Sequence, residues 1–368
     1  MLNYDDYIDK FIDVSIAPLI SKKPPFNFSL DWAAGAFTYT PGAGVLGLLD
    51  IGISDMMGDH RIYIQVEKLS LNGNGYASMQ YWWLRNRIDV AVMLVNQQQE
   101  YAYNYYSTVS ETYNGGGVLL RMPFDRYNRA DLTSFLYKYN KTYNVYTTDS
   151  LYKYPIYSSY IVQNIFSLVH DNGIWGYLGP VNGDMARVDF GIANEISDNQ
   201  SFRVNYIYSY LSADFRKYFV LTTRSQIAAR IGMTSIFPNE GYVYQEYLGG
   251  IMNLRGYSDY EFAAKNVAFA NLELRFPLID KVQFPLYEIS LSNIRGVFFT
   301  DIGFAKDDLS KMRLINDQYL LDDLKMGFGA GIRMDIWITI LKLDIAKHTD
   351  LQYISPETYY HLSFGAEF

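Results

Sequence analysis

The chain has 368 residues, with 31 Lys and Arg against 39 Asp and Glu, a formal net charge of −8 and no cysteine. The absence of cysteine excludes disulfides, thiolate metal sites and a cysteine nucleophile. The acidic balance argues against a protein that mainly grips nucleic-acid phosphates, because that task needs a cationic surface. With only four scattered histidines, we expect no metal, no cofactor and no nucleic-acid partner.

The first 25 residues differ from the rest of the chain. Apolar residues recur there at helix-like spacing, at Tyr4, Tyr7, Ile8, Phe11 and Ile12, before Lys22-Lys23-Pro24-Pro25. This pattern predicts a short helix or linker over 1–25 that leads into a first strand. It lacks the basic start and apolar core of a signal peptide. No run in the chain approaches the ~18–20 consecutive apolar residues of a membrane-spanning helix.

From residue 26 onward, apolar and polar residues alternate with a period of two, most clearly over 269–276, 327–335 and 358–368. Such a period indicates strands with one apolar and one polar face. About sixteen candidate strands follow, and most reach the ~9–11 residues that cross a bilayer when tilted. They fall at approximately 26–39, 43–54, 60–70, 75–84, 88–100, 115–122, 126–139, 158–170, 183–193, 201–211, 216–231, 266–276, 293–303, 327–337, 339–348 and 358–368.

Alternation alone does not say which face is inside, because a soluble β-protein buries the apolar face whereas a transmembrane barrel turns it to lipid. Three features favour the membrane: charges of both signs on the polar faces, aromatic residues gathered near strand ends, and an aromatic final residue, Phe368, on the apolar parity. Tight turns alternate with long polar stretches, as they do between the two ends of an outer-membrane barrel.

We therefore predict an all-β fold, a closed antiparallel transmembrane β-barrel over 26–368. Closure is expected because backbone groups left unpaired at a strand edge are costly in lipid. A soluble carbohydrate-binding β-protein is the alternative for the fold, and the two differ in whether the protein stays soluble without detergent.

Several motifs of the last third stand in a recognisable order. Gly249-Gly250 is followed by Leu254-Arg255-Gly256-Tyr257, then by the strand 271–278 (NLELRFPL) and the strand 296–303 (GVFFTDIG). In order and spacing these motifs resemble the barrel domain of the BamA/TamA (bacterial surface antigen) family of outer-membrane proteins. The resemblance extends over residues 26–368 and is strongest in the last third.

The resemblance implies a long extracellular loop that folds back into the barrel lumen. Its tip would be Leu254-Arg255-Gly256-Tyr257, with Arg255 paired to Glu273 and Asp301 on the wall. Strand parity agrees, because Glu273 shares the polar face with its neighbours two residues away. A guanidinium can hold carboxylates bidentately, and glycine allows the sharp turn. Out of context, Arg-Gly-Tyr is an ordinary loop turn; the two acidic strands that follow favour the lock.

The resemblance also implies a bacterial outer-membrane location and a non-enzymatic role in inserting outer-membrane proteins. The mechanism would use a lateral gate between the first and last strands, softened by Gly35 and Gly365 and ending at Phe368. The implied partners are outer-membrane lipids, unfolded outer-membrane protein clients and periplasmic accessory proteins. Family members usually carry periplasmic modules before the barrel, and the 25 residues that precede the first strand are too few for one, so we expect a barrel-only member or a lost module.

Other functions stay open at this point. The same lumen could pass a secreted polypeptide or small solutes, which predicts a large conductance once the loop is displaced. An outer-membrane hydrolase would need a Ser, His and carboxylate constellation, and the four histidines lack a paired serine motif. Asp335 and Asp344 could form an acid–base pair, but inward charges of this kind are more simply wall residues. We therefore expect no enzyme activity.

Overall fold

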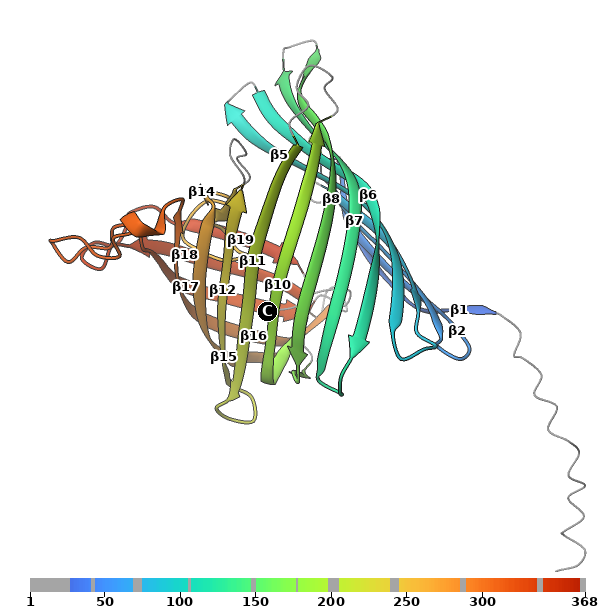
Figure 1. Cartoon of the computed structure of the whole chain (residues 1–368). Coiled ribbons are helices and arrows are strands. Elements are labelled where there is room, and N and C mark those ends of the chain that lie inside the picture. Colours follow the sequence, from blue (N-terminus) through green and yellow to red (C-terminus); the bar gives the residue numbers. More distant parts are fainter. Residues whose placement is uncertain are drawn as a thin grey trace, which may run out of the picture.

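A computed structural model of the chain describes residues 27–40, 44–68, 75–104, 107–146, 150–176, 178–197, 205–238, 245–284, 289–335 and 340–364. Strands dominate these residues (Figure 1). The strands are β1 (Phe28–Thr40), β2 (Gly44–Asp55), β3 (His60–Lys68), β4 (Gly75–Trp83), β5 (Asp89–Asn104), β6 (Ser107–Pro123), β7 (Asn128–Tyr146), β8 (Leu151–Asp171), β9 (Ile174–Trp175), β10 (Pro180–Ser197), β11 (Asn205–Val220), β12 (Gln226–Pro238), β13 (Glu246–Leu248), β14 (Phe262–Ala264), β15 (Asn266–Phe284), β16 (Ile289–Lys306), β17 (Lys325–Asp335), β18 (Ile340–Thr349) and β19 (Tyr359–Phe364).

Helix is limited, in these residues, to one 3-10 turn, η1 (Leu309–Lys311). Nothing helical in the described ranges has the length and apolar character needed to span a bilayer. The predicted linker over 1–25 lies outside the described residues.

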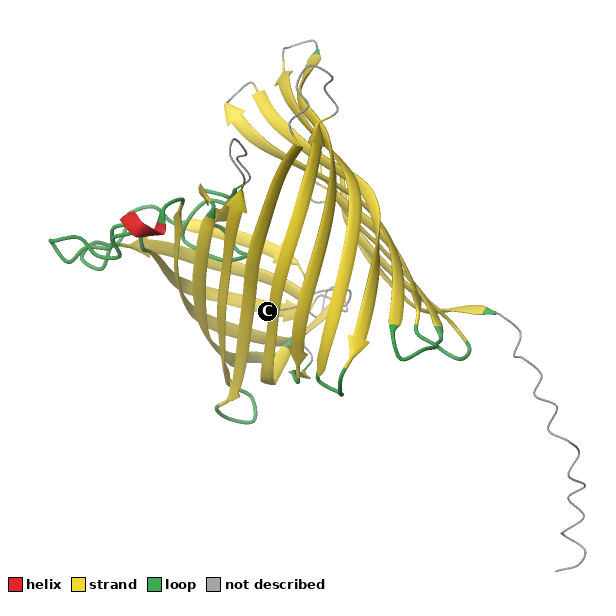
Figure 2. Ribbon diagram, viewed as in Figure 1, coloured by secondary structure: helices red, strands yellow, loops and turns green. Residues whose placement is uncertain are grey.

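The long strands form one antiparallel sheet in which each strand pairs with the next long strand along the chain, from β1–β2 to β18–β19. The sheet has seventeen strands, of which the two-residue β9 pairs only with β10, and β13–β14 form a separate small hairpin. Figure 2 shows the sheet twisted and curved around a central space. Within the described ranges, no backbone pairing joins β1 to β19. The all-β antiparallel fold is confirmed, whereas closure and a count of about sixteen barrel strands stay predictions.

The apolar face of the sheet points outward. On β15, Leu272 and Leu274 are 49% and 39% exposed, whereas Glu273 and Arg275 between and beyond them are 2% and 1% exposed. The same inversion occurs on β18, where Ile345 is exposed and Asp344 is buried. A water-soluble domain rarely exposes contiguous apolar surface on this scale, so the strand faces have the orientation that lipid requires.

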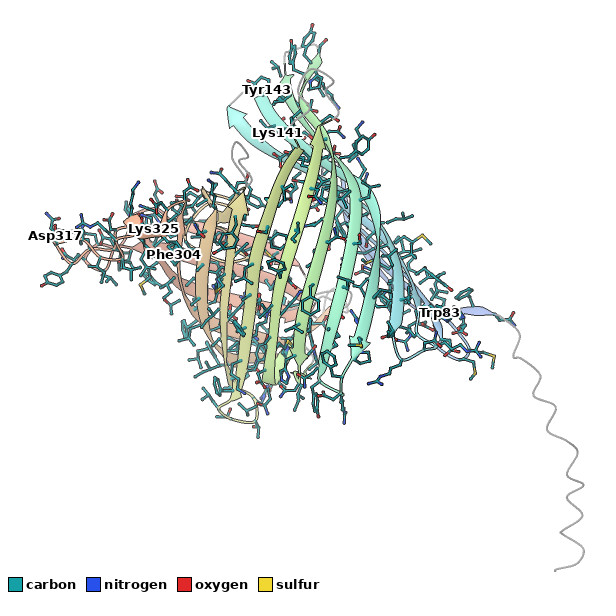
Figure 3. The ribbon with its side chains drawn as sticks, viewed as in Figure 1. Trp83, Lys141, Tyr143, Phe304, Asp317 and Lys325 are labelled. Atoms are coloured by element: carbon teal, nitrogen blue, oxygen red, sulfur yellow. The ribbon has the colours of Figure 1, made fainter. Side chains whose placement is uncertain are left out.

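Aromatic residues at the strand ends divide between the two faces. Trp83 is an exposed residue at the end of β4, among the short turns (Figure 3). Its neighbour Trp82 is buried, with the Arg121 guanidinium carbon 4.5 Å from its ring centroid. Of these two aromatic residues near a strand end, only Trp83 faces outward, because the period of two sends every second side chain inward.

Several strands extend further than the sequence pattern predicts. The polar, tyrosine-rich stretches 101–114 and 140–157 read as loops, but β5–β6 and β7–β8 continue through them as long hairpins. Inward-facing rings stabilise this extension, such as Tyr113 and Tyr139, whose centroids are 5.0 Å apart. The turn predicted between 211 and 216 is also wrong. Residue Asp214 lies inside β11, and the chain turns at 221–225, where the Thr222 hydroxyl accepts hydrogen bonds from the backbone N–H groups of Arg224 and Ser225.

Because the apolar face of the sheet points outward, the loss of stability on introducing a charged residue should depend on its position. Leu272→Arg is expected to destabilise the protein by about 2–4 kcal/mol, the cost of arginine on the lipid face near the bilayer midplane. Leu314, in the connection after β16, is equally exposed at 50%, so Leu314→Arg is the matched control and should change stability by less than about 0.5 kcal/mol. Urea unfolding in lipid vesicles measures both, and equal effects would contradict a lipid-facing β15.

Candidate functional site

The connection between β12 and β15 returns to the wall of the sheet through a glycine turn. Gly249 and Gly250 have φ angles of 126° and 87°, a region that side chains rarely adopt. Gly250 and Leu254 then exchange backbone hydrogen bonds of 3.0 and 3.1 Å. The Asn253 side-chain oxygen accepts from the Gly249 N–H at 2.8 Å. The two glycines thus shape a compact loop that presents residues 254–257.

Two apolar side chains hold the loop tip against the wall. Leu254 is fully buried in a cluster with Leu248 and Val267. Tyr257 is also buried and stacks on His348 of β18, with ring centroids 4.7 Å apart and planes 19° apart. Because both contacts exclude water, the residue between them is held in a low-dielectric environment.

Arg255 is that residue, and it is 3% exposed. Its guanidinium forms a bidentate pair with Asp301 of β16, with Nε–Oδ2 and Nη2–Oδ1 distances of 2.7 and 2.8 Å. The Arg255 backbone N–H also donates to Asp301 Oδ2 at 3.0 Å. Its Nη1 donates to Glu273 Oε1 of β15 at 2.6 Å. The Phe299 ring lies below the guanidinium carbon, 3.6 Å from centroid to carbon.

The surrounding charges balance. Besides Asp301 and Glu273, Arg255 Nη1 donates to Asp344 Oδ2 of β18 at 3.2 Å. Arg275 Nη2 lies 2.7 Å from Glu273 Oε2, and Arg333 Nη2 lies 3.0 Å from Asp344 Oδ2. Three buried guanidinium groups therefore face three buried carboxylates, which offsets the cost of removing each charge from water. Burial by itself would lower the pKa of Arg255, but the neighbouring carboxylates raise it above its ordinary value.

We call this cluster the loop-tip lock, formed by Arg255, Arg275, Arg333, Glu273, Asp301 and Asp344. The tip residues Leu254, Arg255, Gly256 and Tyr257 and the partners Glu273 and Asp301 lie together as the sequence predicts. Asp344 is a missed member, since we read it as a wall charge. Its alternation with Leu343 and Ile345 places it on the inner face, but no local pattern shows which strand lies opposite the loop tip.

Where the backbone of the tip lies closest to the wall, glycine is required both in the tip and in the wall. Gly256 has φ +94°, and a Cβ there would lie 2.8 Å from the Lys347 carbonyl oxygen. A Cβ on Gly327 of β17 would collide with the Arg255 carbonyl oxygen. Backbone of the tip thus lies directly on β17 and β18.

One of the three predicted gate residues lies in the described part of the chain. Gly35 is in β1, in register with Leu49 of β2, whereas Gly365 and Phe368 lie outside the described residues. Across the described ranges, no group of three or more His, Asp or Glu side chains is arranged to hold a metal ion. The Asp335 and Asp344 acid–base hypothesis is not supported, because Asp344 is engaged by two guanidinium groups.

Comparisons with known proteins agree with this geometry. The chain matches the Omp85 superfamily domain over residues 60–368. BamA from Haemophilus ducreyi lacking POTRA domains 1–3 is structurally similar, with a TM-score of 0.63 and 15% identity, over 92% of this chain and 70% of that chain. CdiB from Acinetobacter baumannii has a TM-score of 0.54 and 14% identity, over 92% of this chain and 59% of that one.

CdiB from Escherichia coli has a TM-score of 0.55 and 13% identity, over 93% of this chain and 67% of that one. No curated protein sequence matches the chain. At these identities the structural likeness bears on the fold, and the superfamily match over most of the chain bears on descent. The chain belongs to the Omp85 superfamily and is a protein of the bacterial outer membrane.

Proposed function

We propose that this protein inserts outer-membrane proteins through a lateral gate between β1 and β19. In this proposal residues 26–368 form one closed barrel of about sixteen strands, and residues 1–25 are a linker. The superfamily supports insertion or translocation of outer-membrane substrates in general. The gate is the specific step that we add, and it requires no enzymatic chemistry.

One observation carries the proposal. Every other long strand of the sheet has a long neighbour on both sides, whereas, in the described ranges, the ladder of β1 leads only to β2 and that of β19 only to β18. An edge strand presents unpaired backbone N–H and C=O groups, and such groups can bind a client strand by β-augmentation.

The surroundings of the seam fit this mechanism. The apolar outer face keeps both end strands in contact with outer-membrane lipids, so a client strand added there would already face the bilayer. The loop-tip lock holds β15, β16 and β18 together through charged contacts. In the described ranges β19 contributes no carboxylate to Arg255, so it can move without breaking these ion pairs. Unfolded outer-membrane proteins are the proposed clients, and periplasmic accessory proteins the proposed helpers.

A vesicle assay tests the proposal. The full chain is incorporated into vesicles, and an unfolded small β-barrel protein is added as the client. We expect the client to become heat-modifiable at least about tenfold faster than with vesicles that contain an unrelated barrel of similar size, because a templated edge lowers the insertion barrier. An equal rate in both vesicles would contradict the insertion proposal.

The alternative is a translocation pore for polypeptides or solutes. The charged inner face of the strands favours it, because a polar lumen can hold water. Vesicles that contain the Arg255→Ala variant distinguish the two. A large single-channel conductance without any gain in client insertion would favour the pore.

A further inference from the structure

Two histidines from the last two strands bracket the peptide groups of Gly256. His348 Nδ1 of β18 lies 2.9 Å from the Gly256 carbonyl oxygen. On the other side, the Gly256 N–H donates to His361 Nε2 of β19 at 3.3 Å. We call this pair of hydrogen bonds the Gly256 clasp. It is distinct from the loop-tip lock, because it holds the tip by its backbone rather than by the guanidinium.

The clasp fixes the proton positions on both rings. A carbonyl oxygen only accepts, so His348 must carry its proton on Nδ1. A backbone N–H only donates, so His361 Nε2 must carry a lone pair. A doubly protonated His361 would present an N–H to the N–H of Gly256, and the hydrogen bond would be lost. Histidine is the side chain whose protonation normally changes near neutral pH.

The clasp also reaches β19, which the loop-tip lock does not. The carboxylates bound to Arg255 come from β15, β16 and β18. Within the described ranges, β19 contacts the loop through His361, which accepts from the Gly256 N–H, whereas the Tyr359 hydroxyl donates to Glu357. The Tyr359 and His361 rings are stacked, with planes 12° apart. The last strand is therefore tied to the tip by a neutral contact that can break while the charged lock stays intact.

We propose that His361 is a positioning residue that couples the loop tip to the last strand. While Nε2 accepts from Gly256, the tip holds β19 against β18. Loss of that acceptor, by substitution or by protonation, frees β19 without displacing Arg255. The inference rests on the gate proposed above, but its test reads conformation rather than insertion. Failure of the gate assay and failure of the coupling are therefore distinguishable.

Several charged and titratable groups face His361 and set its protonation. From the loop they are Arg255 and Asp259, and from the wall they are Asp301 of β16 and Asp344 of β18. Tyr359 of β19 stacks on His361 and also contacts the ring of His348 of β18. Asp301 and Asp344 are already paired with arginines of the loop-tip lock, so Asp259 is the further carboxylate in these surroundings. Protonation of His361 would break the clasp by removing the lone pair that accepts from Gly256.

Hydrogen–deuterium exchange on the full chain, folded in detergent, tests the coupling. His361→Phe keeps a ring beside Tyr359 but removes the acceptor, whereas His361→Gln keeps an acceptor that does not titrate. We expect His361→Phe to raise exchange about fivefold in peptides covering both 249–261 and 359–364, the effect of one lost hydrogen bond. Peptides that carry Glu273 and Asp301 should not change. His361→Gln should retain the wild-type values.

A pH series separates coupling from a merely structural role. After correction for intrinsic rates, wild-type protection of both peptides should fall as the pH is lowered through the protonation of His361, and that of His361→Gln should not. His170 of β8 is the control, because its Nδ1 lies 2.8 Å from Asn128 Oδ1, far from the loop. His170→Phe should follow the wild-type profile.

Three results would overturn the coupling. One is wild-type exchange in His361→Phe, another is a failure of His361→Gln to restore protection, and the third is one shared pH profile for wild type and His361→Gln. If His361→Phe does not fold, the pH profiles of wild type and His361→Gln still test the coupling.

Discussion

Arg255→Ala is expected to destabilise the folded protein by about 3–5 kcal/mol, the cost of leaving a buried charge without its partner. The orphaned charge is Asp301, which is fully buried and whose remaining described side-chain partner is the Asn271 amide at 2.8 Å. Glu273 and Asp344 keep Arg275 and Arg333. Urea unfolding of the full chain in vesicles, followed by tryptophan fluorescence, measures the loss.

A second substitution in the Arg255→Ala background shows which carboxylate has lost its partner. Asp301→Asn should recover part of the loss in the Arg255→Ala background, because it removes the uncompensated carboxylate. Glu273→Gln should make the same background worse, because it leaves Arg275 without its counter-ion. Arg187→Ala is the external control. Arg187 is half exposed and pairs with Asp189, so its loss should cost no more than about 1 kcal/mol. An equal recovery by Asp301→Asn and Glu273→Gln would contradict this account of the lock.

Lysine at position 255 should be an intermediate case. Its ammonium can occupy only one of the positions that the guanidinium fork fills around Asp301 and Glu273. The bidentate geometry, rather than charge alone, therefore explains why this site holds arginine.

The period-two alternation predicts which strand faces point outward, but it does not predict how far the strands of the tyrosine-rich hairpins extend. Leu272 and Glu273 are placed correctly because burial requires one side chain to face the bilayer and its neighbour to face inward. The tyrosine-rich ends of β5 to β8 are missed because polar residues and tyrosines interrupt the apolar alternation there. The turn at 221–225 is missed because the predicted strand 216–231 runs through it, whereas Asp214 and Arg216 form ion pairs within β11 and on to β12.

The sequence also identifies some residues of the candidate site and misses others. A short motif identifies Arg255, and its spacing to the next two strands identifies Glu273 and Asp301. Asp344 lies 89 residues beyond Arg255 in the chain. Its contact with Arg255 depends on the register of every strand between them, which no local pattern fixes. His361 is missed for the same reason, although its place opposite Asp344 in the β18–β19 ladder follows once that register is known.

The lock and the clasp differ in the free energy needed to open them. The lock contains six buried ionised groups, so opening it would expose charges that lack partners in the lumen. The clasp contains neutral hydrogen bonds, which cost about 1 kcal/mol each to lose. Thermal motion therefore opens the clasp far more often than the lock. A gate driven by small energies should work at β19 while Arg255 stays in place.

A disulfide across the seam is expected to abolish client insertion while leaving the barrel folded. The chain has no cysteine of its own, so every disulfide comes from the introduced pair. No register between β1 and β19 guides the choice, so single cysteines along Phe28–Thr40 are combined with single cysteines along Tyr359–Phe364. A pair forms a disulfide only where its Cα atoms lie within about 7 Å, so the pairs that oxidise also report whether the seam is closed.

Oxidation of such a pair should lower client insertion at least about tenfold, because the two edges can no longer separate to bind a client strand. Reductant should restore insertion, which excludes damage from the substitutions themselves. Phe190→Cys with Leu211→Cys is the matched control, because these residues are in register between β10 and β11, away from the seam. Normal insertion by a protein that is fully oxidised at the seam would rule out the lateral gate. If no pair oxidises in the folded protein, the closed barrel is wrong. Loss of insertion only at the seam would place client entry between β1 and β19, the two ends of the sheet.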